Sequence, residues 1–326
     1  MIALGIESTA HTFGVGIVSK KNVLVNLRDS YTTEKGGIIP TEAAEHHKKI
    51  AMDLVREAIE IFEKESKGKK IDLVVYSRGP GIGPCLHVGK NTAREVGKNL
   101  GVPVIGINHC VAHLSVGSLV TPVKDPVLLY ASGANTQIIA YEGKKYRVFG
   151  ETLDQGIGNF IDSFARHMGL GFPGGPKIEV LAKKGRKYIE LPYSVKGMDI
   201  SLSGMLTNLK NKFDSKEFSE KDLAYSLQET AFAMLVEVAE RAMAHCGKKE
   251  LLIGGGVGCN SRLQEMCAIM CKERGAKFYA PPKGLLVDNG AMIAYQGILE
   301  HCAGRKESKV EVRPYERTDD ILVDWK

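Results

Sequence analysis

The sequence lacks features that would tie it to a secreted or membrane protein. Its seven cysteines are scattered, odd in number and contain no C-x-x-C pair, so we expect free thiols in a reducing cytoplasm. No apolar run approaches the roughly 18 residues that a membrane-spanning helix needs. The apolar residues 2–6 run directly into Glu7, which does not fit a signal peptide. We therefore predict a cytoplasmic protein without a membrane partner.

Two catalytic signatures are also missing. No G-x-x-x-x-G-K-[ST] phosphate loop is present, so a simple P-loop nucleotidase is not indicated. A zinc protease of the H-E-x-x-H type needs a glutamate beside its first histidine, whereas Cys110 follows His109 here. Together with the missing signal peptide, this disfavours a secreted glycoprotein protease.

What remains is an ordinary globular composition. The chain has 326 residues, 44% hydrophobic and 25% charged, which is enough to form two domains or two halves of one unit. The formal charge of +6 permits a polyanionic partner such as nucleic acid without requiring one.

One pattern occurs twice in the chain. Residues 5–20 and 129–143 each contain an apolar run, a turn of small polar residues and a second apolar run. A glycine-rich loop follows an apolar strand at residues 77–83 and again at residues 254–258. The order of elements predicts an α/β protein with a duplicated βββαβα core in two lobes. We place the lobes at residues 1–125 and 126–326, the second with a helical insertion at about 155–245.

The expected elements follow hydrophobic periodicity. In the first half, strands are expected at 2–7, 14–18, 23–28, 73–76 and 103–107, with helices at about 41–65 and 88–100 and from 109. In the second, strands are expected at 127–130, 137–141, 146–149, 251–253 and 277–279, with helices from about 260 and from 288. Surface connections are expected at 184–199 and 212–221, and after Ala303 a charged tail that returns to a strand at 321–325.

Ligands of such folds bind in the crevice beyond the strand ends. Two hairpin turns facing each other there would hold a phosphate chain from both sides. The alternative is that both are plain β-turns, which favour the same residue types.

Four residues suggest a metal site. His109 and His113 are four apart at the start of a predicted helix, which places both imidazoles on one face. Tyr130 precedes the second turn, and Asp288 lies in a short loop before the last helix. If these meet at the lobe junction, they suit one divalent ion, iron or zinc, in a Lewis-acid role. The alternative is a wet helix face carrying two histidines.

A second group suggests a nucleotide site. Asp162 is on a predicted helix, and a Gly174-Gly175-Pro176 turn precedes Glu179. Carboxylates in such positions hold ribose hydroxyls in nucleotide-binding folds. Asn260 stands near the N-cap of the helix after the second glycine loop, where free backbone amides favour anions.

Taken together, the motifs resemble one family along essentially the whole chain. It is the tRNA threonylcarbamoyladenosine synthase family, in its archaeal and eukaryotic form. The matching segments, in order, are GIESTAHTFGVGIV, GGIIPTEAAEHH, SRGPGIGPCLHVG, GVPVIGINHCVAHL, LYASGANTQI, GETLDQGIGNFIDSFAR, GFPGGPKIEVLA, DISLSG, GGGVGCN and VDNGAM. The resemblance implies the two-lobed actin-like ATPase fold, shared with sugar kinases and heat-shock seventy proteins.

The resemblance also implies an activity. The family transfers a threonylcarbamoyl group from threonylcarbamoyl adenylate to the exocyclic amine of the adenosine next to the anticodon, in tRNAs reading codons that begin with adenine. It implies catalytic roles for His109, His113 and Asp288, which with Tyr130 match the family's metal ligands. The residues that match its site for ATP or the adenylate are Tyr130, Ala131, Ser132, Gly133, Ala134, Asp162, Gly175, Glu179 and Asn260.

The implied partners are tRNA, an enzyme that makes the adenylate, and the other subunits of the KEOPS complex. Those subunits are a small kinase-like ATPase, a dimerising subunit and a regulatory subunit. We expect the kinase-like partner to be a separate chain, because this sequence ends at Lys326.

Two further functions are open to the same fold. A small-molecule kinase would need a carboxylate base in the cleft, for which Glu7 is a candidate. A non-catalytic scaffold would close its lobes on ATP and rearrange its partners.

Overall fold

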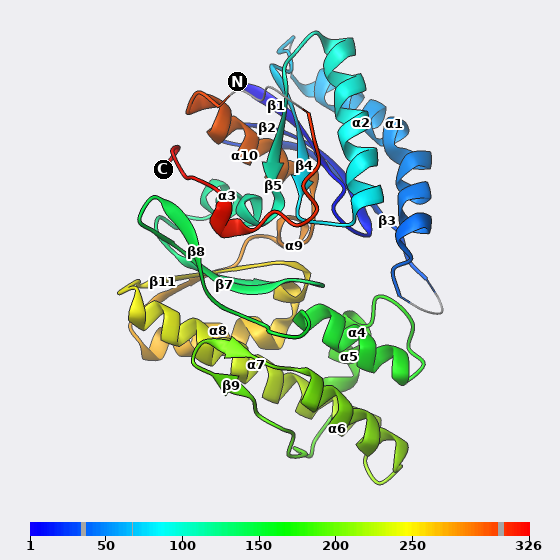
Figure 1. Cartoon of the computed structure of the whole chain (residues 1–326), viewed down its shortest axis with the longest axis vertical. Coiled ribbons are helices and arrows are strands. Elements are labelled where there is room, and N and C mark those ends of the chain that lie inside the picture. The colour runs from blue at the N-terminus through cyan, green and yellow to red at the C-terminus, as the bar shows by residue number, and fades with distance from the viewer. Residues whose placement is uncertain (34–36, 67, 306–309) are drawn as a thin grey trace.

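The computed structural model describes residues 1–33, 37–66, 68–305 and 310–326. Gly36, which begins one of the segments quoted above, and residues 306–309 of the predicted tail lie outside this description. Two five-stranded sheets lie in two lobes, one above the other in Figure 1, with helices packed around each.

The first sheet has the strand order β3-β2-β1-β4-β5. Its strands are β1 (Ile2–Glu7), β2 (Thr12–Ser19), β3 (Val23–Ser30), β4 (Leu73–Gly79) and β5 (Val104–Asn108). β1, β2 and β3 pair antiparallel through hairpins, whereas β1, β4 and β5 run parallel. Parallel pairing requires a crossover, and helices supply it.

The second sheet repeats this topology. Its order is β12-β11-β6-β7-β8, so β6 takes the place of β1 and β11 that of β4. The strands are β6 (Val127–Ala131), β7 (Thr136–Glu142), β8 (Lys145–Glu151), β11 (Glu250–Gly254) and β12 (Lys277–Tyr279). β6–β7–β8 are antiparallel, and β6, β11 and β12 are parallel. The predicted duplicated α/β core is confirmed.

The helices complete each lobe. Those of the first half are α1 (Pro40–Glu65), α2 (Gly83–Leu100) and α3 (His109–Val120). Between β8 and β11 come α4 (Ile157–His167), α5 (Gly175–Ala182), the short strands β9 (Val195–Lys196) and β10 (Asp199–Ile200), α6 (Ser203–Asp214) and α7 (Glu220–His245). The rest are η1 (Gly256–Cys259), α8 (Ser261–Glu273), α9 (Lys283–Leu286), α10 (Gly290–Cys302) and η2 (Thr318–Asp320).

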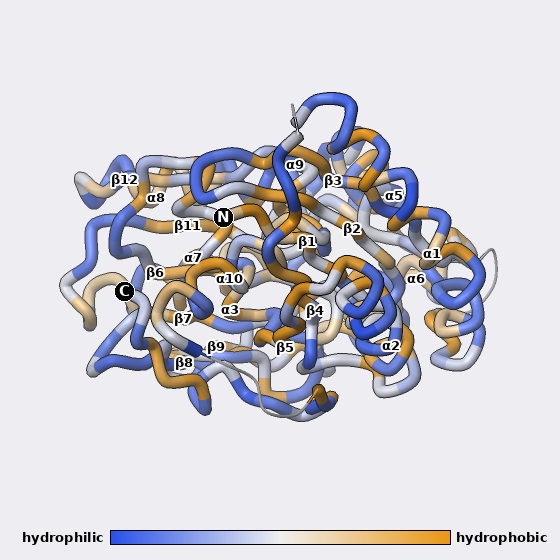
Figure 2. Tube along the Cα trace, turned by 90° about the horizontal axis from the view of Figure 1, so that it is seen from above, coloured by the Kyte–Doolittle hydropathy of each residue, from blue (hydrophilic) through white to orange (hydrophobic). Residues whose placement is uncertain are grey.

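Helix α1 shows why these segments fold as they do. Its buried residues recur every three or four positions and so form one stripe, listed as Ala43, His47, Ala51, Val55, Ala58 and Phe62. That stripe is the face an amphipathic helix buries. Figure 2 shows the same division, with hydrophobic residues along the strands and hydrophilic residues along much of the outer tube.

Four expectations about elements were wrong. The stretch 184–199 is not only a surface connection, because Ile189 and Leu191 are buried and β9 lies within it. Helix α2 begins at Gly83 rather than at 88, because Pro84 suits the first turn of a helix, where no amide hydrogen bond is lost. The stretch 212–221 is not all surface connection, since α6 continues to Asp214. The predicted strand 321–325 does not form: only Leu322 bridges to Lys145.

Helix α10 belongs to the second half of the sequence but packs on the first sheet. Its residues Ala291 and Ile293 share a buried cluster with Ala3 of β1. The contact is backbone to backbone. A Cβ atom on Gly16 would lie 2.2 Å from the Ala291 nitrogen, and one on Gly5 2.3 Å from the Ala294 nitrogen. Glycine is therefore required at both positions.

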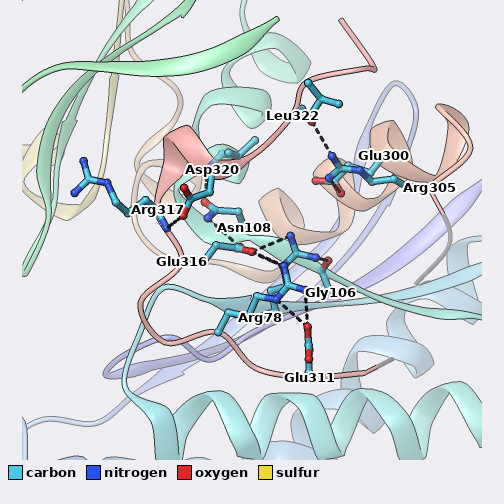
Figure 3. Close-up of polar contacts among 12 residues, drawn as sticks. Arg78, Gly106, Asn108, Glu300, Arg305, Glu311, Glu316, Arg317, Asp320 and Leu322 are labelled. Atoms are coloured by element: carbon cyan, nitrogen blue, oxygen red, sulfur yellow. Dashed lines mark hydrogen bonds and ion pairs between the residues drawn. The ribbon is translucent and has the colours of Figure 1, made fainter. Parts of the chain in front are cut away.

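Residues 310–326, which we call the C-terminal strap, contact both lobes. The Tyr76 hydroxyl on β4 donates to the carbonyl of Glu311 at 2.8 Å. Figure 3 shows Arg78 and Asn108 of the first lobe bonded to Glu316. Further along, Leu322 bridges to β8 of the second lobe. The strap thus ties together two lobes joined by few other segments. None of the described helices is long and apolar enough to cross a membrane.

The α10 contact predicts the effect of a single methyl group. Gly16→Ala should lower the free energy of unfolding by about 1–3 kcal/mol, because backbone atoms of α10 must move. Denaturant unfolding measures this. The matched control is Gly204→Ala in α6, where an added Cβ meets nothing within 4 Å, so stability should not fall and can rise by up to about 1 kcal/mol. Equal stabilities of the two variants would contradict the packing argument.

Candidate metal and nucleotide site between the lobes

A cavity of about 710 Å³ lies between the lobes. The turn after β1 lines one side with Thr9, Ala10 and His11, and the turn after β6 lines the other with residues 132–135. The two hairpin turns therefore face each other across the cavity, as predicted. Helix α4 contributes Asn159, Asp162 and Arg166, and the strap contributes Pro314.

The second turn is held in place by helix α4. The Ser132 amide donates to the Asn135 carbonyl at 3.1 Å, which closes the turn. The first amides of α4, on Gly158 and Asn159, donate to the carbonyls of Ser132 and Gly133. Ala134 is not among the described residues with positive φ, so its methyl group fits this turn without strain. Ala131 is fully buried and lies behind the cavity wall.

The four predicted metal ligands converge at the buried end of the cavity. The Nε2 atom of His109 lies 3.1 Å from the Tyr130 hydroxyl and 3.4 Å from Oδ1 of Asp288. Nε2 of His113 lies 3.3 Å from the same carboxylate oxygen. The histidines come from α3, the tyrosine from β6 and the aspartate from the segment leading into α10. The alternative of a wet helix face is excluded, because His109 and His113 are 4% and 1% exposed.

The distances fit a metal ion. Bonds of about 2.1 Å in a tetrahedron place ligand atoms about 3.4 Å apart, which matches three of the spacings here, 3.1–3.4 Å. The ligand atoms of His109, His113 and Asp288 all lie within 4.8 Å of one another. Two imidazoles, a phenol and a carboxylate are the mixed nitrogen and oxygen donors that iron and zinc accept.

Electrostatics also favour a cation. Burial lowers the pKa of His113, which leaves its imidazole neutral and able to bind metal. Burial alone would lower the pKa of His109 too, but the carboxylates of Glu7 and Asp288 raise it well above 6.5. Burial acts to raise the pKa of Asp288, yet the two histidines hold it well below 3.8. The carboxylates of Glu7, which is buried, and Asp288, which is 17% exposed, hold a proton on His109 that a metal ion binding there would replace.

Glu7 proves to be the orienting partner of His109. One carboxylate oxygen accepts from Nδ1 of His109 at 2.8 Å, and the other from the Thr9 amide at 2.6 Å. Such a bond fixes the imidazole with Nε2 turned toward the metal position. The sequence offered Glu7 only as a candidate kinase base. Glu7 is the last residue of a strand whose other residues are apolar and buried. A carboxylate buried in such a position needs a specific partner, and this was the sequence signal for its role.

The predicted nucleotide residues form a connected wall leading away from the metal end. Oδ1 of Asp162 accepts from the amides of Gly174 and Gly175 at 2.7 and 3.3 Å, so it caps α5. Glu179, one turn along α5, accepts from the Ser261 hydroxyl at 2.6 Å. Asn260 adjoins Ser261 and caps α8.

Only part of this wall lines the cavity. Asp162 reaches it, whereas Gly175, Glu179 and Asn260 lie beyond its lining. Sequence reasoning missed several lining residues, among them Thr9, His11, Asn159 and Arg166. Only their membership of the two repeated turns and of the helix carrying Asp162 could have indicated them.

Comparison with known proteins decides the family. The family model for tRNA N6-adenosine threonylcarbamoyltransferase matches residues 22–295. The chain belongs to this family. Its members' activity, transfer of a threonylcarbamoyl group to N6 of a tRNA adenosine, agrees with the function implied by the sequence motifs.

Full-length relatives support the assignment. The chain is 55% identical to the tRNA N6-adenosine threonylcarbamoyltransferase of Thermococcus kodakarensis and 53% identical to that of Archaeoglobus fulgidus, with complete coverage of both chains. It is 51% identical to a probable bifunctional tRNA threonylcarbamoyladenosine biosynthesis protein of Methanocaldococcus jannaschii, matching all of this chain and 60% of that one.

Solved structures confirm the fold. HypF of T. kodakarensis matches 91% of this chain and 47% of its own, with a TM-score of 0.62 and 15% sequence identity. Component A of the (R)-2-hydroxyglutaryl-CoA dehydratase of Acidaminococcus fermentans covers 91% of this chain and 98% of its own, with a TM-score of 0.54 and 13% identity. These similarities establish the predicted two-lobed, actin-like architecture.

The wall predicts nucleotide binding. ATP or an adenylate analogue should raise the melting temperature, because a ligand that binds only the folded state stabilises it. Asp162→Ala and Glu179→Ala should each reduce that rise, the first by removing a group from the cavity and the second by releasing α5 from Ser261. Thermal unfolding over a ligand titration measures both. Unchanged affinity in Glu179→Ala would remove Glu179 from the site.

Proposed function

We propose that this chain transfers the threonylcarbamoyl group of threonylcarbamoyl adenylate to the exocyclic amine of the adenosine next to the anticodon, in tRNAs that read codons beginning with adenine. The observation that carries the proposal is the convergence of His109, His113, Tyr130 and Asp288 at the buried end of a cavity enclosed by two facing turns. A C–N bond forms to the carbamoyl carbon, the C–O bond to the phosphate of AMP breaks, and the amine nitrogen releases one proton to solvent.

The donor is already activated, since its carbamoyl carbon is joined to phosphate in a mixed anhydride. The protein therefore needs to orient two reactants and stabilise negative charge on the carbonyl oxygen, rather than form a covalent intermediate. A divalent ion held by the four ligands would supply Lewis acidity at that oxygen or hold the threonyl carboxylate. Glu7 keeps His109 in the ligating orientation.

The cavity gives the donor a direction. The wall from Asp162 to Asn260 suits the adenosine half of the ligand, and the two turns suit its phosphate. The carbamoyl end then points toward His109 and Asp288, which line the opposite end. Proximity of a bound donor to the attacking amine supplies much of the rate.

A small-molecule kinase is less well supported. Its candidate base, Glu7, is fully buried, and both of its oxygens are engaged by Thr9 and His109. An ATP-gated scaffold would have no use for four convergent ligands. The chemistry of the site therefore favours group transfer over both alternatives.

We also propose the setting in which the enzyme acts. Bifunctional relatives, which are longer than this chain, indicate that a second activity in the same pathway accompanies this domain. We infer a KEOPS complex with a small kinase-like ATPase, a dimerising subunit and a regulatory subunit, in the cytoplasm, supplied by an enzyme that makes the adenylate. Reconstitution with tRNA, threonine, bicarbonate and ATP, followed by nucleoside analysis, tests the function.

The ligand cluster predicts a shared loss of metal and activity. His109→Ala, His113→Ala and Asp288→Ala should each lower the transfer rate by roughly 100-fold or more. Nucleotide affinity should fall much less, because other residues hold the adenosine. Metal analysis, melting temperature and transfer are measured on the same preparations.

The control variant is His167→Ala, which removes a partly exposed histidine bonded to Asp214 outside the cavity. It should retain metal and activity. Full transfer by a demonstrably metal-free variant lacking both His109 and His113 would refute the metal mechanism.

The modest charge predicts how tRNA binds. With a formal charge of +6, the isolated chain should bind tRNA weakly and with strong salt dependence, and more tightly once partners add their surfaces. Filter binding across a range of salt concentrations measures this. Nanomolar affinity of the chain alone at physiological salt would show a stronger basic face than we infer.

A further inference from the structure

Tyr315 is a large aromatic residue with no burial to explain it. Its side chain is 94% exposed, whereas the next most exposed tyrosines, Tyr188 and Tyr193, are each 51% exposed. No step of the proposed mechanism uses it. Among the described residues it is the most exposed of the large hydrophobic side chains.

The backbone around Tyr315 is nevertheless fixed. The Arg313 amide donates to the Arg78 carbonyl at 2.6 Å, and the Gly81 amide donates to the Pro314 carbonyl at 3.1 Å. The Glu316 carboxylate, 4% exposed, accepts from Arg78 and Asn108. Figure 3 shows the contacts of Glu316 with Arg78 and Asn108. The tyrosine is therefore presented to solvent from a rigid support.

Tyr315 directly follows a residue of the cavity lining. Its neighbour Pro314 lines the cavity that holds His109 and Asp288. Pro314 further approaches the first turn of α2, where a Cβ on Gly83 would be 4.0 Å from its ring. A tRNA is too large to enter a cavity of about 710 Å³ whole, so it must contact surface residues near the lining, and Tyr315 is an exposed residue next to one of them.

The proposed reaction removes one base from its stack, and an exposed aromatic ring can replace the stacking contact that is lost. A tRNA adenosine must leave its stack for its N6 amine to reach a buried site, as bases modified by other enzymes do. The base next to it then loses a stacking neighbour. Proteins that read unpaired RNA loops supply aromatic side chains as replacement stacking surfaces.

Cationic side chains lie near Tyr315, where the phosphates of an RNA would need them. Arg313 and Arg317 flank Tyr315 and are 49% and 51% exposed, although both also pair with acidic side chains. On α2, His87 and Lys90 follow Gly83 by four and seven residues, so they lie on the helix face that meets Pro314. Phosphates beside a loop base would meet these cationic groups.

We propose that Tyr315 is a substrate-positioning residue: its ring stacks on an unpaired tRNA base adjacent to the adenosine that enters the cavity. This inference rests on the proposed function, because it takes the adenosine to be one in a tRNA loop. The phenol ring takes no part in bond making, so its contribution appears in RNA binding and in the KM for tRNA.

The test uses the full-length chain and an anticodon stem-loop RNA with 2-aminopurine on one side or the other of the target adenosine. Stacking on tyrosine quenches this fluorescent base. Wild type and Tyr315→Phe should quench one of the two probes. Tyr315→Ala should abolish that quenching and raise the Kd for the RNA roughly tenfold, as loss of one base–aromatic stack does.

Matched controls separate stacking from folding. Tyr188→Ala removes a half-exposed tyrosine outside the cavity lining and should leave quenching and RNA affinity unchanged. The ATP-induced rise in melting temperature should be the same in Tyr315→Ala as in wild type. In transfer assays, Tyr315→Ala should raise the KM for tRNA and leave the KM for the adenylate unchanged.

Equal quenching and equal RNA affinity in Tyr315→Ala and wild type would overturn the proposal. So would a defect of Tyr315→Ala that appears only when partner proteins are added, with quenching intact, because that would make the ring a protein contact. Failure of the proposed function looks different: wild type would quench the probe, but a complete reconstitution would yield no modified nucleoside.

Discussion

The close approach of α10 to the hairpin of β1 and β2 sets the geometry of the whole site. Glycines at positions 5, 16 and 290 let backbone meet backbone there. The contact anchors the helix whose preceding residues include Asp288, and so fixes that carboxylate opposite His109 and His113. Interiors packed at this density transmit small displacements rather than absorb them. The close backbone contact of α10 therefore limits how far Asp288 can move relative to His109 and His113.

The site joins groups whose individual burial would be unfavourable. A buried carboxylate, a buried imidazole and a buried phenol each cost free energy unless they are paired. Here Glu7, His109, Tyr130 and Asp288 satisfy one another through short contacts, and an added cation would neutralise the remaining negative charge. The arrangement stabilises the fold and prepares the chemistry with the same few side chains.

Much of this was predictable because repetition and spacing are local signals. The two turns and the i, i+4 histidine pair follow from patterns within a few residues, and the duplicated order of elements follows from comparing the two halves of the chain. The role of Glu7 did not follow, because its partner His109 is 102 residues away. Residues 321–325 were predicted to form a strand because they are mostly apolar, but Arg305 and Lys144 bond to their backbone instead. Contacts between distant segments carry no periodicity to detect.

The path of the strap affects how one lobe can rotate against the other. Within the described residues, the chain passes between lobes after α3, again just before α10, and a third time along the strap near Glu316. Two of these passages adjoin the histidines and Asp288. A rotation of one lobe against the other must turn about the segments that join them, and points near the axis of a rotation move least. Such a rotation would widen the cavity mouth while changing the spacing of His109, His113 and Asp288 least.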